Sequence, residues 1–210
     1  MPRLAVAERR AALVEAALRV MVRDGLAAGT TRAIVAEAGM SLASFHYAFT
    51  SRAELLGELV ARVVGRELSA AAAGWQPSEG LAACLRTAAA GYLAHLEQEP
   101  GQEQLMLELT LLAVRRPDLR PIAAEQYRAY SAAATGLLEQ AAILTGASWR
   151  RPVPELARLL ITLVDGATTA WLVDRDTAAT RAVLFAAVDL FVEEFKDPVP
   201  PTPRKLGAGP

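Results

Sequence analysis

Apolar residues recur every three or four positions along most of the chain, with polar and charged residues between them. In the segment 52–73, for example, Leu55, Leu59 and Val63 fall on one side of a helix, as that spacing requires. The alternation that marks a β-strand is nearly absent, and Ala, Leu, Glu and Arg, all good helix formers, dominate the composition. The pattern predicts an all-α protein of about nine helices.

Gly and Pro breaks divide this pattern into segments. The N-terminal segments predict a helix at 7–23, two short helices within 30–49 and a long helix at 52–73. Beyond a break at 74–78, five further helices are expected, at 79–98, 102–115, 118–145, 155–173 and 177–196.

The stretch 30–49 has the features of two short helices joined by a tight turn. Thr30 or Thr31 can cap the first helix, since a hydroxyl accepts a hydrogen bond from a free backbone N–H. Gly39 can take the left-handed conformation that ends that helix, and Ser41 can cap the next one. A connection this short makes the two helices cross steeply, which predicts a helix-turn-helix.

The second of these helices has two different faces. Phe45 and Phe49 lie four residues apart, so they share the face that packs inward. Ser44, His46 and Tyr47 fall largely on other faces. A hydroxyl, an imidazole and a phenol add little to a core, but they suit hydrogen bonds to phosphates and base edges.

The segment TTRAIVAEAGMSLASFHYAFTSRAEL resembles the DNA-binding domain of TetR-type transcriptional repressors. It departs from the usual pattern at Val35, at Leu42 and Ala43, and at Arg52, where Lys is common; Arg keeps the charge but not the geometry of Lys. The resemblance covers residues 30–55, where it is carried by Thr31, Ile34, Ala38, Gly39, Ser41, Ser44, Phe49, Ser51 and Leu55.

The resemblance implies a ligand-responsive repressor that binds a near-palindromic operator on double-stranded DNA as a homodimer. A small molecule in the helical body would release the DNA. With the helix faces described above, it predicts DNA contacts from Thr31, Arg32, Ser41, Leu42, Ala43, Ser44, His46, Tyr47 and Arg52.

Charge supports this interpretation only weakly. The 210-residue chain has a formal net charge of −1, so any surface for DNA must be local. Residues 1–55 contain seven arginines and five acidic residues, a small basic excess. An alternative therefore stays open: a helical small-molecule-binding or interaction module that does not bind DNA.

Beyond the DNA-binding segment, the pattern predicts a helical body followed by a C-terminal tail. We expect a DNA-binding domain at 1–55, a ligand-binding and dimerisation domain at 56–196, and a Pro-rich, disordered tail at 197–210. The last two predicted helices are apolar over more than one stripe, so they need cover on two sides. A homodimer through these two helices would supply that cover, and the resemblance implies the same arrangement.

A few polar or aromatic residues interrupt the apolar helical stretches of the body. If Glu108 and Asp165 both faced a pocket, a lipophilic cation or an amine would be a natural effector, because unpaired buried carboxylates are costly. Arg115 and Arg116 could instead pair with them. The candidate ligand residues are His95, Glu108, Tyr127, Tyr130, Asp165 and Trp171.

The sequence gives no sign of catalysis. It has neither a metalloprotease HExxH motif nor a phosphate-binding loop nor a nucleophile elbow, so we expect no enzyme, cofactor or metal site. Cys84, the single cysteine, is expected to be a buried small apolar residue. The N-terminus lacks the apolar run of a signal peptide and no stretch has the purity of a membrane span, so a cytoplasmic location is expected.

Overall fold

The computed structural model describes residues 5–75 and 80–197, and within these ranges the chain is helical, with no β-strand beyond one isolated bridge. The all-α prediction is confirmed. The α-helices are α1 (Val6–Asp24), α2 (Thr31–Glu37), α3 (Leu42–Ala48), α4 (Arg52–Ala72), α5 (Leu81–Gln98), α6 (Pro100–Arg115), α7 (Arg120–Thr145), α8 (Val153–Asp174) and α9 (Thr177–Phe195).

Helices α1 to α3 and the first turns of α4 form a head whose buried core continues into α6 and the start of α7. Gly39 has a φ of +63°, so α2 ends in a left-handed residue as predicted. Ser41 caps α3 by accepting a hydrogen bond from the Ser44 N–H. The rings of Phe45 and Phe49 are buried, and α2 and α3 both pack on α1.

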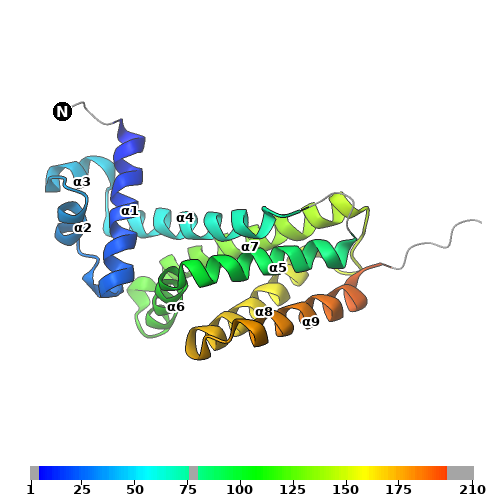
Figure 1. Ribbon diagram of the computed structural model, residues 1–210. Helices are drawn as coiled ribbons and strands as arrows, with labels where there is room; N and C mark the ends of the chain where they lie inside the picture. Colours follow the sequence, from blue (N-terminus) through cyan, green and yellow to red (C-terminus); the bar gives the residue numbers. More distant parts are fainter. Residues whose placement is uncertain (1–4, 76–79, 198–210) are drawn as a thin grey trace, which may run out of the picture.

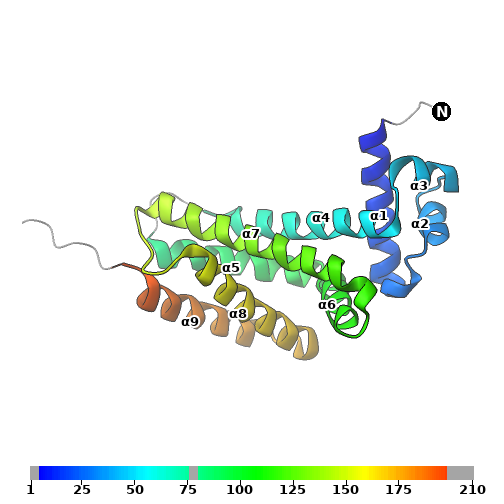
Figure 2. The same ribbon diagram turned by 180° about the vertical axis from the view of Figure 1, so that it is seen from behind.

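Helix α4 belongs to both the head and the body. Its first turns contribute Leu55 and Leu59 to the head, and its later turns run beside α5 and α7 (Figure 1). A domain boundary placed at residue 55 therefore lies inside this helix. Seen from behind, α1 stands across the end of α4, and α6 lies on the side of the body near the head (Figure 2).

Helices α8 and α9 lie side by side along one edge of the body (Figure 1). Several of their apolar side chains face outward: Val183 is 60% exposed and Leu190 is 67% exposed. By length and composition α8 could cross a membrane, with 28% of its apolar stretch buried. A single such helix is weak evidence for a membrane protein, because helices of soluble proteins pass the same test.

The predicted segments differ from the observed helices mainly at their ends. Helix α8 begins before Pro154 because proline is tolerated in the first turn, where its missing N–H has no helical partner. Two short 3₁₀ turns, η1 (Leu26–Ala28) and η2 (Pro117–Leu119), were not predicted. Cys84 is fully buried, as expected. Most of the predicted tail, residues 198–210, lies outside the described residues.

Candidate functional site

The outer face of α3 carries the polar and aromatic groups that the sequence indicated. His46 and Tyr47 are exposed, and 65% of Tyr47 is accessible to solvent. Leu42 and Ala43 are exposed at the start of the same helix. The Arg9 guanidinium lies 5.0 Å from the centre of the Tyr47 ring, a cation–π contact that places a positive charge beside the phenol.

The small hydroxyl residues of the head have structural partners. The hydroxyls of Ser41 and Ser44 are 3.0 Å apart and bond to each other. Thr30, not Thr31, caps α2 by accepting from the Ala33 N–H, which leaves Thr31 as the first residue of that helix. Arg32 is exposed and makes no ion pair with a described residue. Of the arginines assigned to DNA, it is the one that faces solvent.

The side chain of Arg52, which was predicted to contact phosphate, bonds to backbone carbonyls of the head. Its Nε donates to the Gly29 carbonyl at 2.7 Å, and its Nη2 donates to the Leu26 carbonyl at 2.8 Å. These bonds hold η1 and the residue after it against the first turn of α4. Burial, followed by the nearby charge of Arg116, lowers the pKa of Arg52. Two of its three donor nitrogens are therefore engaged within the protein, and a phosphate contact from Arg52 stays a prediction.

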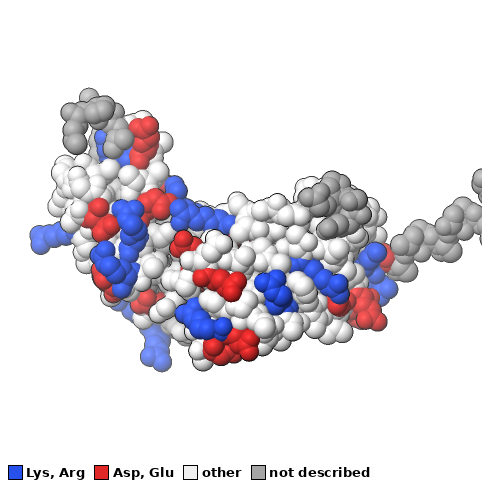
Figure 3. Space-filling view, viewed as in Figure 1, with Lys and Arg blue, Asp and Glu red and all other residues white. Residues whose placement is uncertain are grey.

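Most other arginines of the head are engaged in ion pairs. Arg10 bridges Glu54 and Glu58 of α4, and Arg19 and Arg23 both reach Glu37 of α2. Accordingly, basic and acidic side chains lie mixed together on the visible face of the head (Figure 3). The small basic excess of residues 1–55 is therefore not gathered into one patch on this face.

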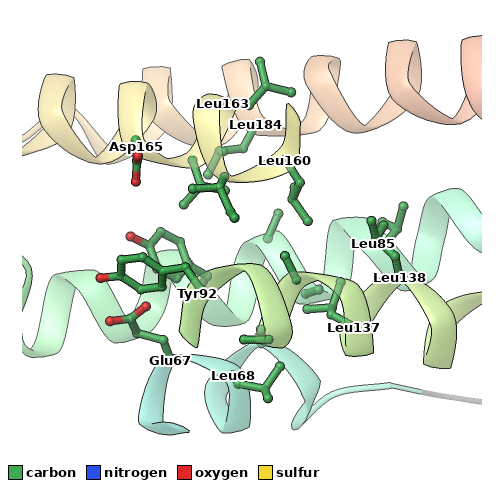
Figure 4. Close-up of a pocket in the computed structure, with 18 of the residues that line it drawn as sticks. Glu67, Leu68, Leu85, Tyr92, Leu137, Leu138, Leu160, Leu163, Asp165 and Leu184 are labelled. Carbon is green, nitrogen blue, oxygen red and sulfur yellow. The ribbon is translucent and has the colours of Figure 1, made fainter. Parts of the chain in front are cut away.

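The body holds an apolar cavity of about 160 Å³ that is partly open to solvent and is lined by α4, α5, α6, α7, α8 and α9. A second cavity of about 150 Å³ adjoins it, and the two share Glu103, Tyr130 and Asp165 as lining residues. Figure 4 shows leucines from several helices pointing into the first cavity, including Leu68, Leu85 and Leu160. An apolar space with a few polar groups at one end is the usual form of a small-molecule site.

Three carboxyl groups and three tyrosines gather at the polar end of this space. The Tyr127 hydroxyl donates to Asp165 at 3.0 Å, and the Tyr92 hydroxyl lies 2.6 Å from that of Thr168. The Tyr127 and Tyr130 rings meet edge to face. The remaining polar residues of this end are Glu67 on α4 and Glu103 on α6.

Burial changes the acidity of these groups. It raises the pKa of Glu67 well above its usual range, and the negative charge of Glu103 raises it further. Burial also raises the pKa of Glu103, although hydrogen bonds from Glu67 and Tyr92 partly oppose this effect. The pKa of Asp165 is raised by burial too, against the hydrogen bond from Tyr127 and the charge of Arg158.

The structure brings half of the predicted ligand residues to the cavities. Tyr130 and Asp165 line both of them, and Tyr127 lines the second. The other three, His95, Glu108 and Trp171, line neither cavity.

Each of these three residues has another environment. The Glu108 carboxylate turns toward the head and accepts the Leu26 N–H at 3.0 Å. Trp171 is buried between α5, α8 and α9, where its indole N–H donates to Thr177. His95 is half-buried, and this burial lowers its pKa. The alternative in which Arg116 pairs with Glu108 or Asp165 is not what the structure has, since Arg116 pairs with Asp118.

Sequence reasoning missed Glu67, Tyr92 and Glu103, although a signal was present. On α4, Glu67 falls four residues after Val63 and four before Ala71, in the middle of the buried stripe. A carboxyl at such a position points toward the core and not toward the solvent-facing side of the helix. An acidic residue inside an apolar stripe is therefore the sequence feature that could have identified Glu67 as a pocket residue.

A helix-turn-helix head joined by one long helix to a helical body with an apolar cavity defines a class of protein: a DNA-binding regulator with a sensor domain. Residues 13–59 match the family of bacterial regulatory proteins described as the tetR family, and residues 76–193 match the tetracyclin repressor-like C-terminal domain. The chain therefore belongs to the TetR family of transcriptional regulators.

Similar proteins cover nearly the whole chain. The HTH-type nicotine-responsive transcriptional repressor HdnoR of Paenarthrobacter nicotinovorans is 25% identical over 191 residues, which are 91% of this chain and 97% of that protein. A TetR-family regulator structure from Rhodococcus sp. has a TM-score of 0.76 at 22% identity, over 88% of this chain and 98% of that one. The multidrug binding protein EbrR, solved with proflavin, has a TM-score of 0.55 at 28% identity, over 86% and 99%.

Proposed function

We propose that this protein is a homodimeric repressor whose α3 enters the major groove of a near-palindromic operator and whose body binds a small organic effector that releases the DNA. One observation carries the proposal: α4 packs into the head with Leu55 at one end and lines the body cavity with Glu67 at the other. A ligand that moves this helix would move the head.

The exposed apolar side chains of α8 and α9 support the dimer. Val183 and Leu190 face solvent in one chain, and a second copy packed on these helices would cover them. A symmetric dimer presents two copies of α3, which fit successive major grooves when they lie about 34 Å apart.

The contacts of η1 suggest how the body and the head are coupled. This short turn joins α1 to α2 and is held from two sides, by Arg52 of α4 at its carbonyls and by Glu108 of α6 at the Leu26 N–H. Glu103, also on α6, lines both cavities. Any effector with different affinities for two positions of α6 would shift the head between them.

The relatives support an organic small molecule as the effector. HdnoR is named as nicotine-responsive, and EbrR is described as a multidrug binding protein in complex with proflavin. The cavity of about 160 Å³ is similar in volume to an apolar cavity of about 150 Å³ that binds benzene, and it is partly open to solvent, so it can hold at least one ring of such a molecule.

The proposal is tested by selecting bound duplexes from a random DNA pool with the wild type and with Tyr47→Ala. We expect the wild type to enrich a near-palindromic site, with affinity that falls steeply as salt rises. Tyr47→Ala should weaken binding to that site at least about tenfold while the dimer persists in size-exclusion chromatography, since a good base or phosphate contact contributes about 1–3 kcal/mol.

Tyr47→Phe is the matched control, because it keeps the ring beside Arg9 and removes only the hydroxyl. Loss in both variants assigns the contact to the phenol oxygen, and loss in Tyr47→Ala alone assigns it to the ring. No enriched site under any condition would contradict the repressor and favour the binding module without DNA.

A further inference from the structure

Two carboxyl groups at the polar end of the cavity are almost completely removed from solvent. Glu67 is 8% exposed and Glu103 is 6% exposed, and they come from different helices, α4 and α6. Figure 4 shows Glu67 pointing into the cavity from one wall and Asp165 pointing toward it from the opposite wall, with Tyr92 between them. The acidic groups thus converge on one region.

Each of the two carboxyl groups has one oxygen atom without a hydrogen-bond partner among the described residues. The Oε1 atoms of Glu67 and Glu103 are buried and accept no hydrogen bond within the described residues. No Lys, Arg or His lines either cavity in that part of the chain. A buried carboxylate without a positive partner is costly, so the pair must either hold a proton or meet the positive charge of a ligand.

The surrounding groups favour positive charge and oppose negative charge. The titratable groups that face the pair are Tyr92 from α5, Tyr130 from α7 and Asp165 from α8, and none of them is cationic. The faces of tyrosine rings attract cations, most strongly where water is excluded. By contrast, an anionic ligand would meet three acidic groups and no counter-charge.

The shape of the space determines the rest of the ligand. Beyond the carboxyl pair, the first cavity is walled by aliphatic and aromatic side chains such as Leu138, Ile161 and Phe191. A ligand that fills it must present apolar surface there and its charge at the other end.

Building on the effector site proposed above, we propose that Glu67 and Glu103 together bind the positive nitrogen of a monovalent organic cation whose one- or two-ring apolar body fills the adjoining cavity. The cation takes the place of a proton that the two carboxyl groups share when no cation is bound, and this proton passes to solvent. The two groups then carry the negative charge that pairs with the ligand.

The test uses a permanent cation, benzyltrimethylammonium, and its uncharged carbon isostere, neopentylbenzene, with the full-length protein. Calorimetry should show tighter binding of the cation. Glu67→Gln and Glu103→Gln should each weaken binding of the cation at least about tenfold while changing that of the isostere little, because only the charged ligand loses a buried partner. Glu139→Gln, an exposed carboxyl on α7, is the charge-matched control and should bind as the wild type does.

Proton release separates ligand binding from a structural role. In two buffers of different ionisation enthalpy, wild-type protein should release protons on binding the cation, and Glu67→Gln should release fewer. Equal affinity for both probes, or unchanged cation binding in the two variants, would overturn the proposal.

These outcomes are independent of the proposed function. If the protein enriches an operator but prefers the isostere, the repressor stands and the cation site fails. If the cation binds through Glu67 and no operator is found, the site stands and the repressor fails.

Discussion

Two glutamates on α4 show how differently the two ends of the molecule treat the same residue. Glu54, in the first turn, accepts hydrogen bonds from the Thr50 N–H and hydroxyl and from Arg10, which lower its pKa to about 2. Glu67, three to four turns further along, is buried beside another carboxyl, and its pKa is raised well above the usual range. The helix is continuous, so the environment alone makes this difference.

The difference corresponds to what each region is for. In the head, ion pairs and caps satisfy the polar groups and hold α3 in one orientation against α1. In the body, the buried Oε1 atoms of Glu67 and Glu103 accept no hydrogen bond within the described residues, and both carboxyl groups line an apolar pocket. Polar groups that all have hydrogen-bond partners fix the orientation of a helix, whereas buried polar groups without partners are candidates for binding a ligand.

The largest expected effect comes from removing the core of the head. Phe49 is 1% exposed, and its ring packs against Phe45 and under the Arg10 guanidinium. Phe49→Ala should cost about 3–5 kcal/mol of unfolding free energy, because the close-packed side chains around the lost ring can only partly fill the cavity that it leaves. Urea denaturation measures this loss. Leu42→Ala, on the exposed face of α3, is the control, and similar losses in both would show that burial in the head does not govern its stability.

A smaller effect is expected where α4 meets α5 in the body. A Cβ built on Gly91 would lie 2.2 Å from the Ala70 carbonyl oxygen, so the two helix backbones must separate to admit a methyl group. Gly91→Ala should therefore destabilise the protein by about 1–3 kcal/mol, as over-packing does.

Gly136, within α7, offers a matched comparison, because a Cβ there meets open space. Gly136→Ala should raise stability by about 0.4–1 kcal/mol through the lower entropy of the unfolded chain. Thermal unfolding of both variants checks the pair. A stabilising Gly91→Ala would show that the close approach of α4 and α5 is not maintained in solution.

The same contrast explains what the sequence could predict. The head followed from local rules: a glycine where the chain needs positive φ, hydroxyl caps, and two Phe residues at helical spacing, all within residues 30–49. The cavity depends on which turns of five different helices come together. Glu108 and Glu103 lie five residues apart on α6, yet one contacts the head and the other lines the cavity. Only the packing of α6 against both regions separates them.

The smallest effect is the most direct measure of the comparison, because the two glutamates should give stability opposite dependences on pH. Glu54 has a folded pKa of about 2, below its ordinary value of 4.5, so its stabilising contribution is present above pH 4.5 and is lost as pH falls toward 2. Glu67 has a raised folded pKa, so its contribution is present below pH 4.5 and is lost as pH rises through that folded value. The measurement is the urea midpoint of unfolding as a function of pH. Glu54→Gln should reduce only the loss of stability at acid pH, and Glu67→Gln should reduce only the loss of stability as pH rises. If both variants reduced the same loss, the two ends of α4 would not differ as the structure indicates.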